Sequence, residues 1–584
     1  MAAAAVACDG RPRSAASGGA HENRTSGPLV AVFDLSEGVP EQGASGWLGL
    51  SAKSVSIDDL VRESERIDAD KDIRAVLVRL GTARMGLGRA EEIGSILAAV
   101  GAKRTVWCHA DDYGNATIDA AARGCKRVWV SPAASIDAVG LAAQTLYFHK
   151  LLADQLGLDV DFLQVGKFKG AEEPLTRDGP SPEARESLES TLASLRASWL
   201  SEIHAARSAV TGDDLEGGPY SAPEAKAAGL VDDVGYFDEA RDALEKATGA
   251  VRAEVRFGAG APSDSGSELL EAFRTLTGDT APMAPVVVVR AIGSISMDGG
   301  GVLGGDRGIA ASKLVPTLTR LERDDEVKAV VLRIDSPGGS ALASDLLWHA
   351  LMRIRARKTL VVSIGDMAAS GGYYLASSGA TIFADEASIV GSIGVVGGKI
   401  AADQALGRIG IHAETFPAKV GDPRAAPRAE YESLLVPWDE STRARVLATM
   451  TGIYDLFLAR VSEGRRIPVE RVAASAEGRI FGGREAKDRG LVDAIGGLAQ
   501  AIARARSLAG LPADARFGVS DESPGLLGLL TDDEPRALFP ASSAVAPAAL
   551  ARLDPLIAPF VDSLAPLATQ ERAICALPFA LTIR

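Results

Sequence analysis

The chain has 584 residues, of which 47% are hydrophobic and 24% are charged, and its formal net charge at pH 7 is −15. This length is too great for one ordinary hydrophobic core, so we expect two large folded domains. The acidic balance, with no cluster of lysine or arginine, argues against nucleic acid as a partner and against acidic substrates.

The first residues predict no membrane segment. Residues 1–8 end like a lipoprotein cleavage site, but they lack a basic leader and are too short for a signal peptide. Residues 1–28 are otherwise polar and rich in Gly and Ser, which predicts a disordered tail. No run of about 18 apolar residues occurs in the sequence, so no transmembrane helix is predicted.

The chain repeats itself, and the repeat defines its organisation. Residues 59–79 align without a gap with residues 313–333, and residues 223–235 align with residues 484–496. Such internal similarity indicates two copies of one domain joined head to tail. The predicted parts are a first copy at 29–256, a Gly-, Ser- and Pro-rich linker at 257–284, a second copy at 285–510 and an extension at 511–584, for which capping helices are expected.

Each copy alternates short apolar runs with helical segments. Near-continuous apolar strands between helices are typical of a buried parallel sheet in an α/β fold. The predicted strands are 29–35, 75–78 and 105–108 in the first copy and 286–289, 329–332 and 359–363 in the second.

Ser370 lies in the segment Gly-Asp-Met-Ala-Ala-Ser-Gly-Gly-Tyr-Tyr at residues 365–374. A serine on a turn of small residues is well exposed as a nucleophile, but it needs a base and donors for an oxyanion. The turn Asp-Ser-Pro-Gly-Gly at residues 335–339 can supply backbone N–H groups. In the first copy Asn115 replaces the serine and the Ser-Pro-Gly-Gly turn is absent, so that copy has lost its nucleophile.

Three charged residues flank these segments. Arg333 and Asp335 are expected to hold the turn at 335–339 in shape, and Asp366 is expected to cap the segment that leads to Ser370.

Two lysines are candidates for the general base that activates Ser370. None of the six histidines is placed for a Ser-His-Asp triad, since His349 is expected within a helix and His412 follows a strand-like segment. A desolvated lysine can act instead. Lys169 and Lys419 lie in comparable stretches of the two copies, and composition alone favours an exposed role for both.

Four cysteines show no metal-ligand spacing and are too sparse for a disulfide framework, so buried free thiols are expected at Cys8, Cys108, Cys125 and Cys575. No metal or cofactor motif is found, and neither is predicted.

Four motifs, in this order and in these copies, resemble the long form of signal peptide peptidase A, a serine protease of peptidase family S49 in the Clp/crotonase-like superfamily. They are residues 166–174, 335–339, 365–374 and 391–395. The resemblance covers roughly residues 29–511. It implies a tandem repeat of two domains of the ββα superhelix type.

The resemblance also implies roles for individual residues. Ser370 would be the nucleophile, Lys169 of the other copy the general base, and Ser392 the residue that orients the lysine. The backbone N–H groups of Gly339 and Gly371 would form the oxyanion hole. Short-form members carry a lysine near the place of Lys419.

Substrates, partners and location follow from the same resemblance. It implies that the substrates are cleaved signal peptides and other apolar peptides or membrane-protein fragments, bound as an added strand beside the turn at 335–339. It implies a homotetramer around an inner chamber, contact with a membrane surface and a place on the periplasmic side of the bacterial inner membrane. The family's membrane anchor is not seen in this sequence, which by itself assigns no compartment.

Two other functions share this fold. A crotonase-like acyl-CoA enzyme uses the same paired backbone donors but leaves Ser370 and Lys169 without roles. A catalytically inactive scaffold would keep the motifs without turnover, as the first copy has lost its nucleophile. Binding of CoA would indicate the first alternative, and failure to label Ser370 would indicate the second.

Overall fold

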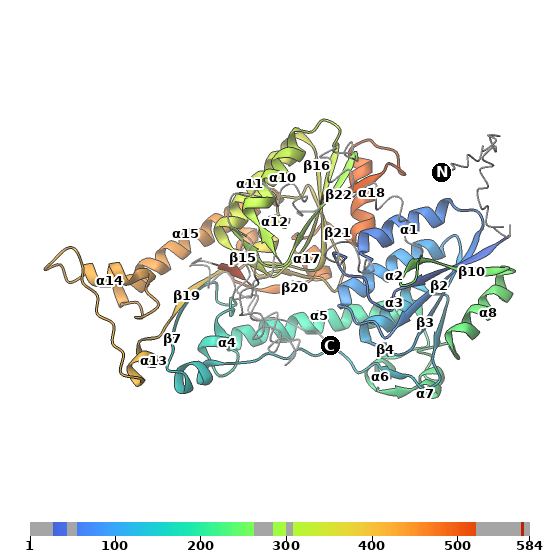
Figure 1. The fold of residues 1–584 in the computed structure, drawn as a ribbon, viewed down its shortest axis with the longest axis horizontal. Helices are drawn as coiled ribbons and strands as arrows, with labels where there is room; N and C mark the ends of the chain where they lie inside the picture. The colour runs from blue at the N-terminus through green and yellow to red at the C-terminus, as the bar shows by residue number, and fades with distance from the viewer. Residues whose placement is uncertain (1–26, 44–54, 262–283, 299–307, 521–573, 577–584) are drawn as a thin grey trace, which may run out of the picture.

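A computed structural model describes residues 27–43, 55–261, 284–298, 308–520 and 574–576 (Figure 1). Its two halves follow the two sequence repeats, and each is built around a parallel sheet with helices packed against it. The first half is coloured blue to green in Figure 1, and the second yellow-green to red.

The sheet of the first half has the strand order β10-β1-β2-β3-β5-β9, and all its neighbours are parallel. Its strands are β1 (Leu29–Asp34), β2 (Ile73–Gly81), β3 (Thr105–Ala110), β5 (Arg127–Val130), β9 (Asp233–Val234) and β10 (Arg252–Gly258). Its helices are α1 (Ile57–Ala69), α2 (Leu87–Gly101), α3 (Asn115–Gly124), α5 (Pro182–Ala206), α6 (Gly212–Glu216), α7 (Ala222–Ala227) and α8 (Phe237–Thr248). A small sheet joins β4 (Tyr113–Gly114), β6 (Ser135–Asp137) and β8 (Tyr220–Ser221).

The second half repeats this order as β22-β11-β14-β16-β17-β21, again all parallel. These strands are β11 (Val286–Ile292), β14 (Ala329–Ser336), β16 (Thr359–Ala369), β17 (Thr381–Ala384), β21 (Ala494–Ile495) and β22 (Phe517–Ser520), and β18 (Ile389–Gly391) and β20 (Ile480–Gly482) extend the sheet beside β16. The helices are α10 (Ala311–Arg323), α11 (Ala341–Arg357), α12 (Gly371–Ala376), α13 (Asp403–Arg408), α14 (Ala425–Ala429), α15 (Glu440–Arg465), α16 (Val469–Ala473), α17 (Gly483–Asp488) and α18 (Leu498–Leu508), with a 3₁₀ turn at Glu430–Glu432.

The predicted α/β fold with a tandem repeat is confirmed, and all six predicted strands correspond to strands of these two sheets, although β1 ends at Asp34, one residue earlier than predicted. The predicted limits of the copies stay predictions. β10 continues to Gly258, inside the predicted linker, and β22 pairs with β11 beyond residue 510. Most of the predicted tail, at 1–26, and most of the linker, at 262–283, lie outside the described residues.

A third sheet joins the halves. Its order is β13-β12-β15-β23-β19-β7, formed by β12 (Ile295–Ser296), β13 (Ile309–Ala310), β15 (Gly338–Ser340), β19 (Val395–Ala401), β23 (Ile574–Ala576) and β7 (Asp159–Val165). β7 belongs to the first copy, between the π-helical turn Leu151–Gln155 and the short helix α4 (Glu173–Thr176). It pairs along its whole length with β19 of the second copy, in antiparallel register from Val165↔Val395 to Asp159↔Ala401 (Figure 1).

One hydrophobic core also spans both halves. Residues of β1, α1 and α2 of the first copy pack in the same buried cluster as residues of β11, β14 and α18 of the second. Helix α18 lies between the second sheet and α1, as Figure 1 shows. Because apolar burial is the main stabilising term in folding, the two copies are expected to fold as one unit rather than as independent domains.

Cys108 and Cys125 form a disulfide, so the prediction of free thiols is wrong for this pair. Cys108 lies in β3 and Cys125 directly follows α3, which returns to the same sheet and brings the two Cα atoms to 5.7 Å. Sequence spacing alone does not show that return. The side chains of Cys8 and Cys575 lie outside the described part of the chain.

Within the described ranges, no helix is both long and apolar enough to cross a bilayer.

Candidate active site

Ser370 and Ser392 follow two neighbouring parallel strands. Ser370 comes directly after β16 and Ser392 directly after β18, and the last residues of these strands pair as Ala369↔Gly391. Parallel strands end at the same edge of a sheet, so the two serines meet there. Both have a positive φ, 55° at Ser370 and 54° at Ser392, and both are fully buried within the chain.

The turn at Ser370 packs tightly on the Ser-Pro-Gly-Gly turn. A Cβ on Gly371 would lie 2.7 Å from Ser344 Oγ and 3.2 Å from the backbone N of Gly339. A Cβ on Gly372 would lie 2.7 Å from the carbonyl oxygen of Ser336. Only glycines allow this approach, which packs Gly371 against the backbone N of Gly339.

Lys169 reaches the same point from the first copy. It follows β7, whose pairing with β19 carries the chain to the end of β18. The loop after α16 holds the segment in place, since Phe168 N–H donates to Glu477 O over 2.7 Å. Glycines leave room for the lysine stem, because a Cβ on Gly394 would lie 3.1 Å from its Cδ, and a Cβ on Gly478 would lie 2.4 Å from its backbone N.

The three side chains meet in a buried cluster. Lys169 Nζ lies 2.7 Å from Ser370 Oγ, 2.9 Å from Ser392 Oγ and 3.0 Å from Ser392 O. All three residues have no exposed surface within the chain. Complete burial of an amine disfavours its charged form, and a lysine must lose that charge before it can act as a base.

Backbone strain is concentrated around this cluster. Of the four non-glycine residues with positive φ in the described part of the chain, Ser370, Ser392 and Glu477 surround Lys169, and only Arg466 lies elsewhere. Such conformations cost about 1–3 kcal/mol each and tend to occur at functional sites.

Glu172 is the carboxyl group one turn beyond Lys169. Burial raises its pKa to about 7, and the neighbouring Glu173 carboxylate contributes in the same direction. An ionised carboxylate here would stabilise the ammonium form of Lys169. Because its pKa is raised to about 7, the Glu172 carboxyl is largely protonated at lower pH and adds little negative charge beside Lys169.

Arg333 was expected to hold the turn at 335–339 in shape, but its guanidinium points to residues outside that turn. Its guanidinium donates to Glu41 and Glu92 of the first copy and, over 2.7 Å, to Ser363 Oγ. Arg89 of the first copy binds the same Glu41 carboxylate. The side chains of Arg333, Arg89, Glu41 and Glu92 are all at least 94% buried. Arg333 therefore connects β14, the strand that leads into the turn at 335–339, to the first copy through buried ion pairs.

Asp366 also contacts the other copy, and the prediction that it caps the Ser370 segment is wrong. Its carboxylate accepts a 2.9 Å hydrogen bond from Arg89 N–H, in the first turn of α2. The N-cap of α2 is Gly86, which has no side chain, and a Cβ there would lie 2.6 Å from Asp366 Oδ1. Asp366 therefore supplies the cap that α2 lacks.

Asp335 lies near the same group of charges. Desolvation raises its pKa well above the usual range, and the carboxylates of Asp366 and Glu41 raise it further. Its backbone carbonyl accepts a 2.8 Å hydrogen bond from Gly293 N–H, which anchors the start of the turn at 335–339 to the end of β11.

The structure separates the two candidate lysines. Lys419 lies in an exposed loop, where its side chain is 75% exposed and pairs with Asp422 over 3.0 Å. In the first copy, Asn115 occupies the place equivalent to Ser370. Its amide donates to Gly140 O over 2.8 Å and its oxygen accepts from Val139 N–H over 3.1 Å, so the residue holds a loop.

Sequence reasoning did not find Glu41, Arg89 or Glu92, and it did not find the loop at Glu477 and Gly478. The only local signal was the pair Glu-Gly at 477–478, whose φ values of 60° and 84° form a left-handed turn. These residues contact the other copy of the domain, and contacts between residues so far apart in the chain produce no repeating pattern in the sequence.

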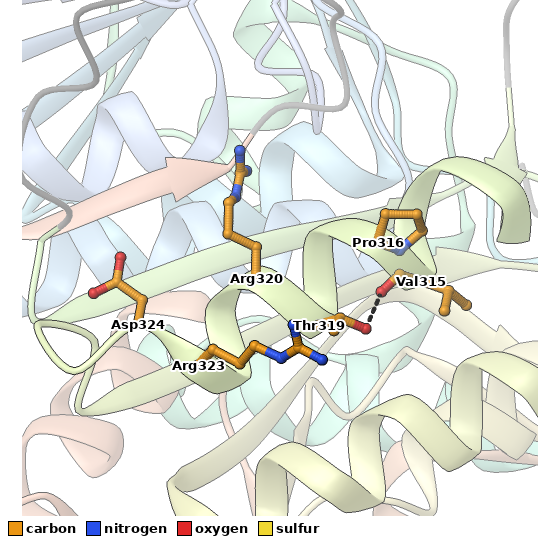
Figure 2. A pocket seen from close by; sticks show the side chains of 6 residues that line it. All are labelled: Val315, Pro316, Thr319, Arg320, Arg323 and Asp324. Atoms are coloured by element: carbon orange, nitrogen blue, oxygen red, sulfur yellow. Dashed lines mark hydrogen bonds between the residues drawn. The ribbon is translucent and has the colours of Figure 1, made fainter.

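A surface pocket on α10 is unrelated to this cluster (Figure 2). It is lined by Val315, Pro316, Thr319, Arg320, Arg323 and Asp324. Among the residues that the structure describes, no group of three or more His, Cys, Asp or Glu side chains could hold a metal ion.

A buried amine against a serine hydroxyl, with a glycine-rich turn packed beside it at the edge of a parallel sheet, is an arrangement suited to nucleophilic acyl transfer. The fold and this site together define the Clp-like class of serine hydrolases. A family model described as Clp protease matches residues 306–390, and one described as peptidase family S49 matches residues 98–251 and 353–512. The chain belongs to peptidase family S49.

Three relatives place the chain within this family. It is 31% identical to Protease 4 of Salmonella typhi over 444 residues, 73% of this chain and 68% of that protein. It is 28% identical to Protease 4 of Haemophilus influenzae over 503 residues, 82% of this chain and 78% of that protein. It is 30% identical to the chloroplastic serine protease SPPA of Arabidopsis thaliana over 399 residues, 66% of this chain but only 56% of that protein.

Proposed function

We propose that the chain is a serine endopeptidase with a Ser-Lys dyad shared between its two copies. The observation that carries the proposal is the 2.7 Å contact between the buried Lys169 Nζ and Ser370 Oγ. Ser370 is the nucleophile, Lys169 the general base and Ser392 the residue that orients the amine. The names of the bacterial relatives, Protease 4, support a peptidase.

The reaction begins when neutral Lys169 takes the proton of Ser370 and Oγ attacks the carbonyl carbon of a peptide. The N–H groups of Gly339 and Gly371 stabilise the oxyanion. The tetrahedral intermediate then collapses, Lys169 gives its proton to the leaving amine, and an ester forms on Ser370. Lys169 next activates a water molecule, which hydrolyses the ester and restores both side chains.

The proposed substrates are cleaved signal peptides and other apolar peptides or membrane-protein fragments. Assembly as a homotetramer, contact with a membrane surface and a periplasmic location in bacteria belong to the same proposal. A crotonase-like acyl-CoA enzyme is disfavoured because it gives the Ser370–Lys169 contact no role.

Hydrolysis of a short apolar fluorogenic peptide by the purified chain tests this function. Ser370→Ala is expected to lower kcat by about 10⁴-fold or more, because it removes the nucleophile. Ser378→Ala is the matched control, since Ser378 is equally buried but its hydroxyl donates to Leu375 O and not to a group of the proposed dyad. Equal rates for wild type and Ser370→Ala would refute the peptidase, and turnover of an acyl-CoA thioester in its place would favour the alternative.

A further inference from the structure

A short segment of the second copy, residues 477–479, contacts the chain on both sides of the buried amine. It lies in the connection between α16 and β20. Toward the first copy, the carbonyl oxygen of Glu477 accepts a 2.7 Å hydrogen bond from Phe168 N–H, and its side-chain Oε2 accepts a 3.1 Å hydrogen bond from Lys167 N–H. Glu477 therefore holds the two residues that directly precede Lys169.

The same segment also fixes the turn that carries Ser392. Gly478 N–H donates to Ile393 O over 2.8 Å, and Ser392 N–H donates to Arg479 O over 2.6 Å. Ser392 contacts Lys169 Nζ through both its hydroxyl and its carbonyl oxygen. One short segment thus sets the position of the lysine relative to the serine that orients it.

Glu477 adopts a backbone conformation that glycine adopts with less strain. Its φ is 60°, in the left-handed region that disfavours residues with a Cβ. Arg466, with a φ of 55°, lies at the C-cap of α15, where a left-handed residue commonly ends a helix. Glu477 instead lies in the segment that contacts the lysine, and strain of this kind tends to occur at functional sites.

The Glu477 side chain is itself held by α15. Tyr454 OH donates to Glu477 Oε1 over 3.2 Å and accepts from Glu477 N–H over 3.3 Å. Burial raises the pKa of Tyr454 to about 12, and the Glu477 carboxylate contributes in the same direction, so the hydroxyl keeps its proton near neutral pH. One carboxylate oxygen therefore lies on the tyrosine and the other on the lysine segment.

We propose that Glu477 is a positioning residue for the reaction, which keeps the amine of Lys169 within hydrogen-bond distance of Ser370. This role rests on the proposed peptidase function. The amine must stay near its present 2.7 Å from Ser370 Oγ to take the proton. A displacement of about 1 Å can lower a rate by about 100-fold, so an anchor on the residues just before the lysine affects the reaction directly.

Glu477→Gly separates this role from folding. Glycine keeps the backbone hydrogen bonds and adopts a φ of 60° without strain, so the urea midpoint of unfolding is expected to stay close to that of wild type. The kcat on the apolar fluorogenic peptide is expected to fall about 10- to 100-fold, because the lysine segment loses its side-chain anchor. KM is expected to change by less than about twofold, since the change affects the amine and not the binding of the peptide.

Two further variants serve as controls. Arg466→Gly also replaces a left-handed residue with glycine, but at an exposed position outside the site, so its kcat is expected to stay within about twofold of wild type. Glu477→Gln keeps an oxygen that accepts from Lys167 N–H and gains an N–H that can donate to the Tyr454 hydroxyl. Its kcat is expected to return to within about threefold of wild type.

Steady-state kinetics and urea denaturation of these variants, beside wild type and Ser370→Ala, distinguish the outcomes. An unchanged kcat in Glu477→Gly, with hydrolysis that still depends on Ser370, would refute the positioning role and leave the peptidase intact. A loss of kcat that accompanies a lower urea midpoint, or a Glu477→Gln variant as slow as Glu477→Gly, would also contradict the role. A wild-type chain without hydrolysis that depends on Ser370 would refute the peptidase itself.

Discussion

Replacing Lys169 with methionine is expected to lower kcat on an apolar peptide by about 10⁴-fold or more, although the residue lies 201 positions from Ser370 in the chain. Methionine fills the buried space of the lysine stem but cannot accept a proton. Nothing else in the described part of the site offers a base within hydrogen-bond distance of Ser370 Oγ.

Lys419→Met is the matched control for this prediction. Its side chain is exposed and paired with Asp422, so kcat is expected to stay within about twofold of wild type. Both variants are compared with wild type by steady-state kinetics, and circular dichroism verifies that they are folded. If Lys419→Met is the inactive variant, the base lies in the second copy and the shared dyad is wrong.

Replacing Arg333 with methionine is expected to destabilise the protein by about 3–5 kcal/mol, because it leaves the carboxylates of Glu41 and Glu92 buried without their main partner. The free energy of unfolding is measured by urea denaturation at pH 7. Arg185→Met is the matched control: the Arg185–Glu189 pair is exposed, so its loss is expected to cost less than about 1 kcal/mol.

The pH dependence of the stability lost in Arg333→Met is a second test of the ion pairs. Burial alone would raise the pKa of Glu41, but Arg333 and Arg89 outweigh burial and lower it to about 2, below its ordinary value of 4.5. The ionised carboxylate therefore stabilises the fold above pH 4.5, and this contribution is lost as the pH falls toward 2. The deficit of Arg333→Met is expected to be largest at pH 7 and smaller at pH 3. An equal deficit at both pH values would contradict the ion-pair account.

The catalytic end of the second copy was predictable because its signals are local. The small residues around Ser370 and the glycines of the turn at 335–339 are needed for close backbone contact, and such contacts leave a visible pattern in the sequence. The repeat itself also predicted two sheets with the same strands. Each of these inferences uses residues that are neighbours in the chain.

The lysine could not be chosen from local pattern. Lys169 and Lys419 lie in similar stretches, and only the resemblance to a family favoured Lys169. In the structure β7 leaves its own copy and pairs with β19 of the other, which brings Lys169 and not Lys419 to Ser370. Pairing over more than 200 residues depends on the fold as a whole and not on the sequence near either strand.

The charges between the copies were missed for the same reason. Arg333 and Asp366 were assigned to the nearest turn, whereas their partners are Glu41, Glu92 and the N–H of Arg89. A buried arginine must find carboxylates somewhere, but the sequence does not say where. Since the first copy supplies both these carboxylates and Lys169, it is expected to be indispensable although it has no nucleophile.

The shared dyad is tested most directly by covalent capture of Ser370 with an apolar peptidyl phosphonate, followed by peptide mapping with mass spectrometry. The account predicts a single adduct, on Ser370, that forms in wild type and in Lys419→Met but not in Lys169→Met. An adduct on Ser370 that forms equally fast in Lys169→Met, or an adduct on another serine, would contradict it.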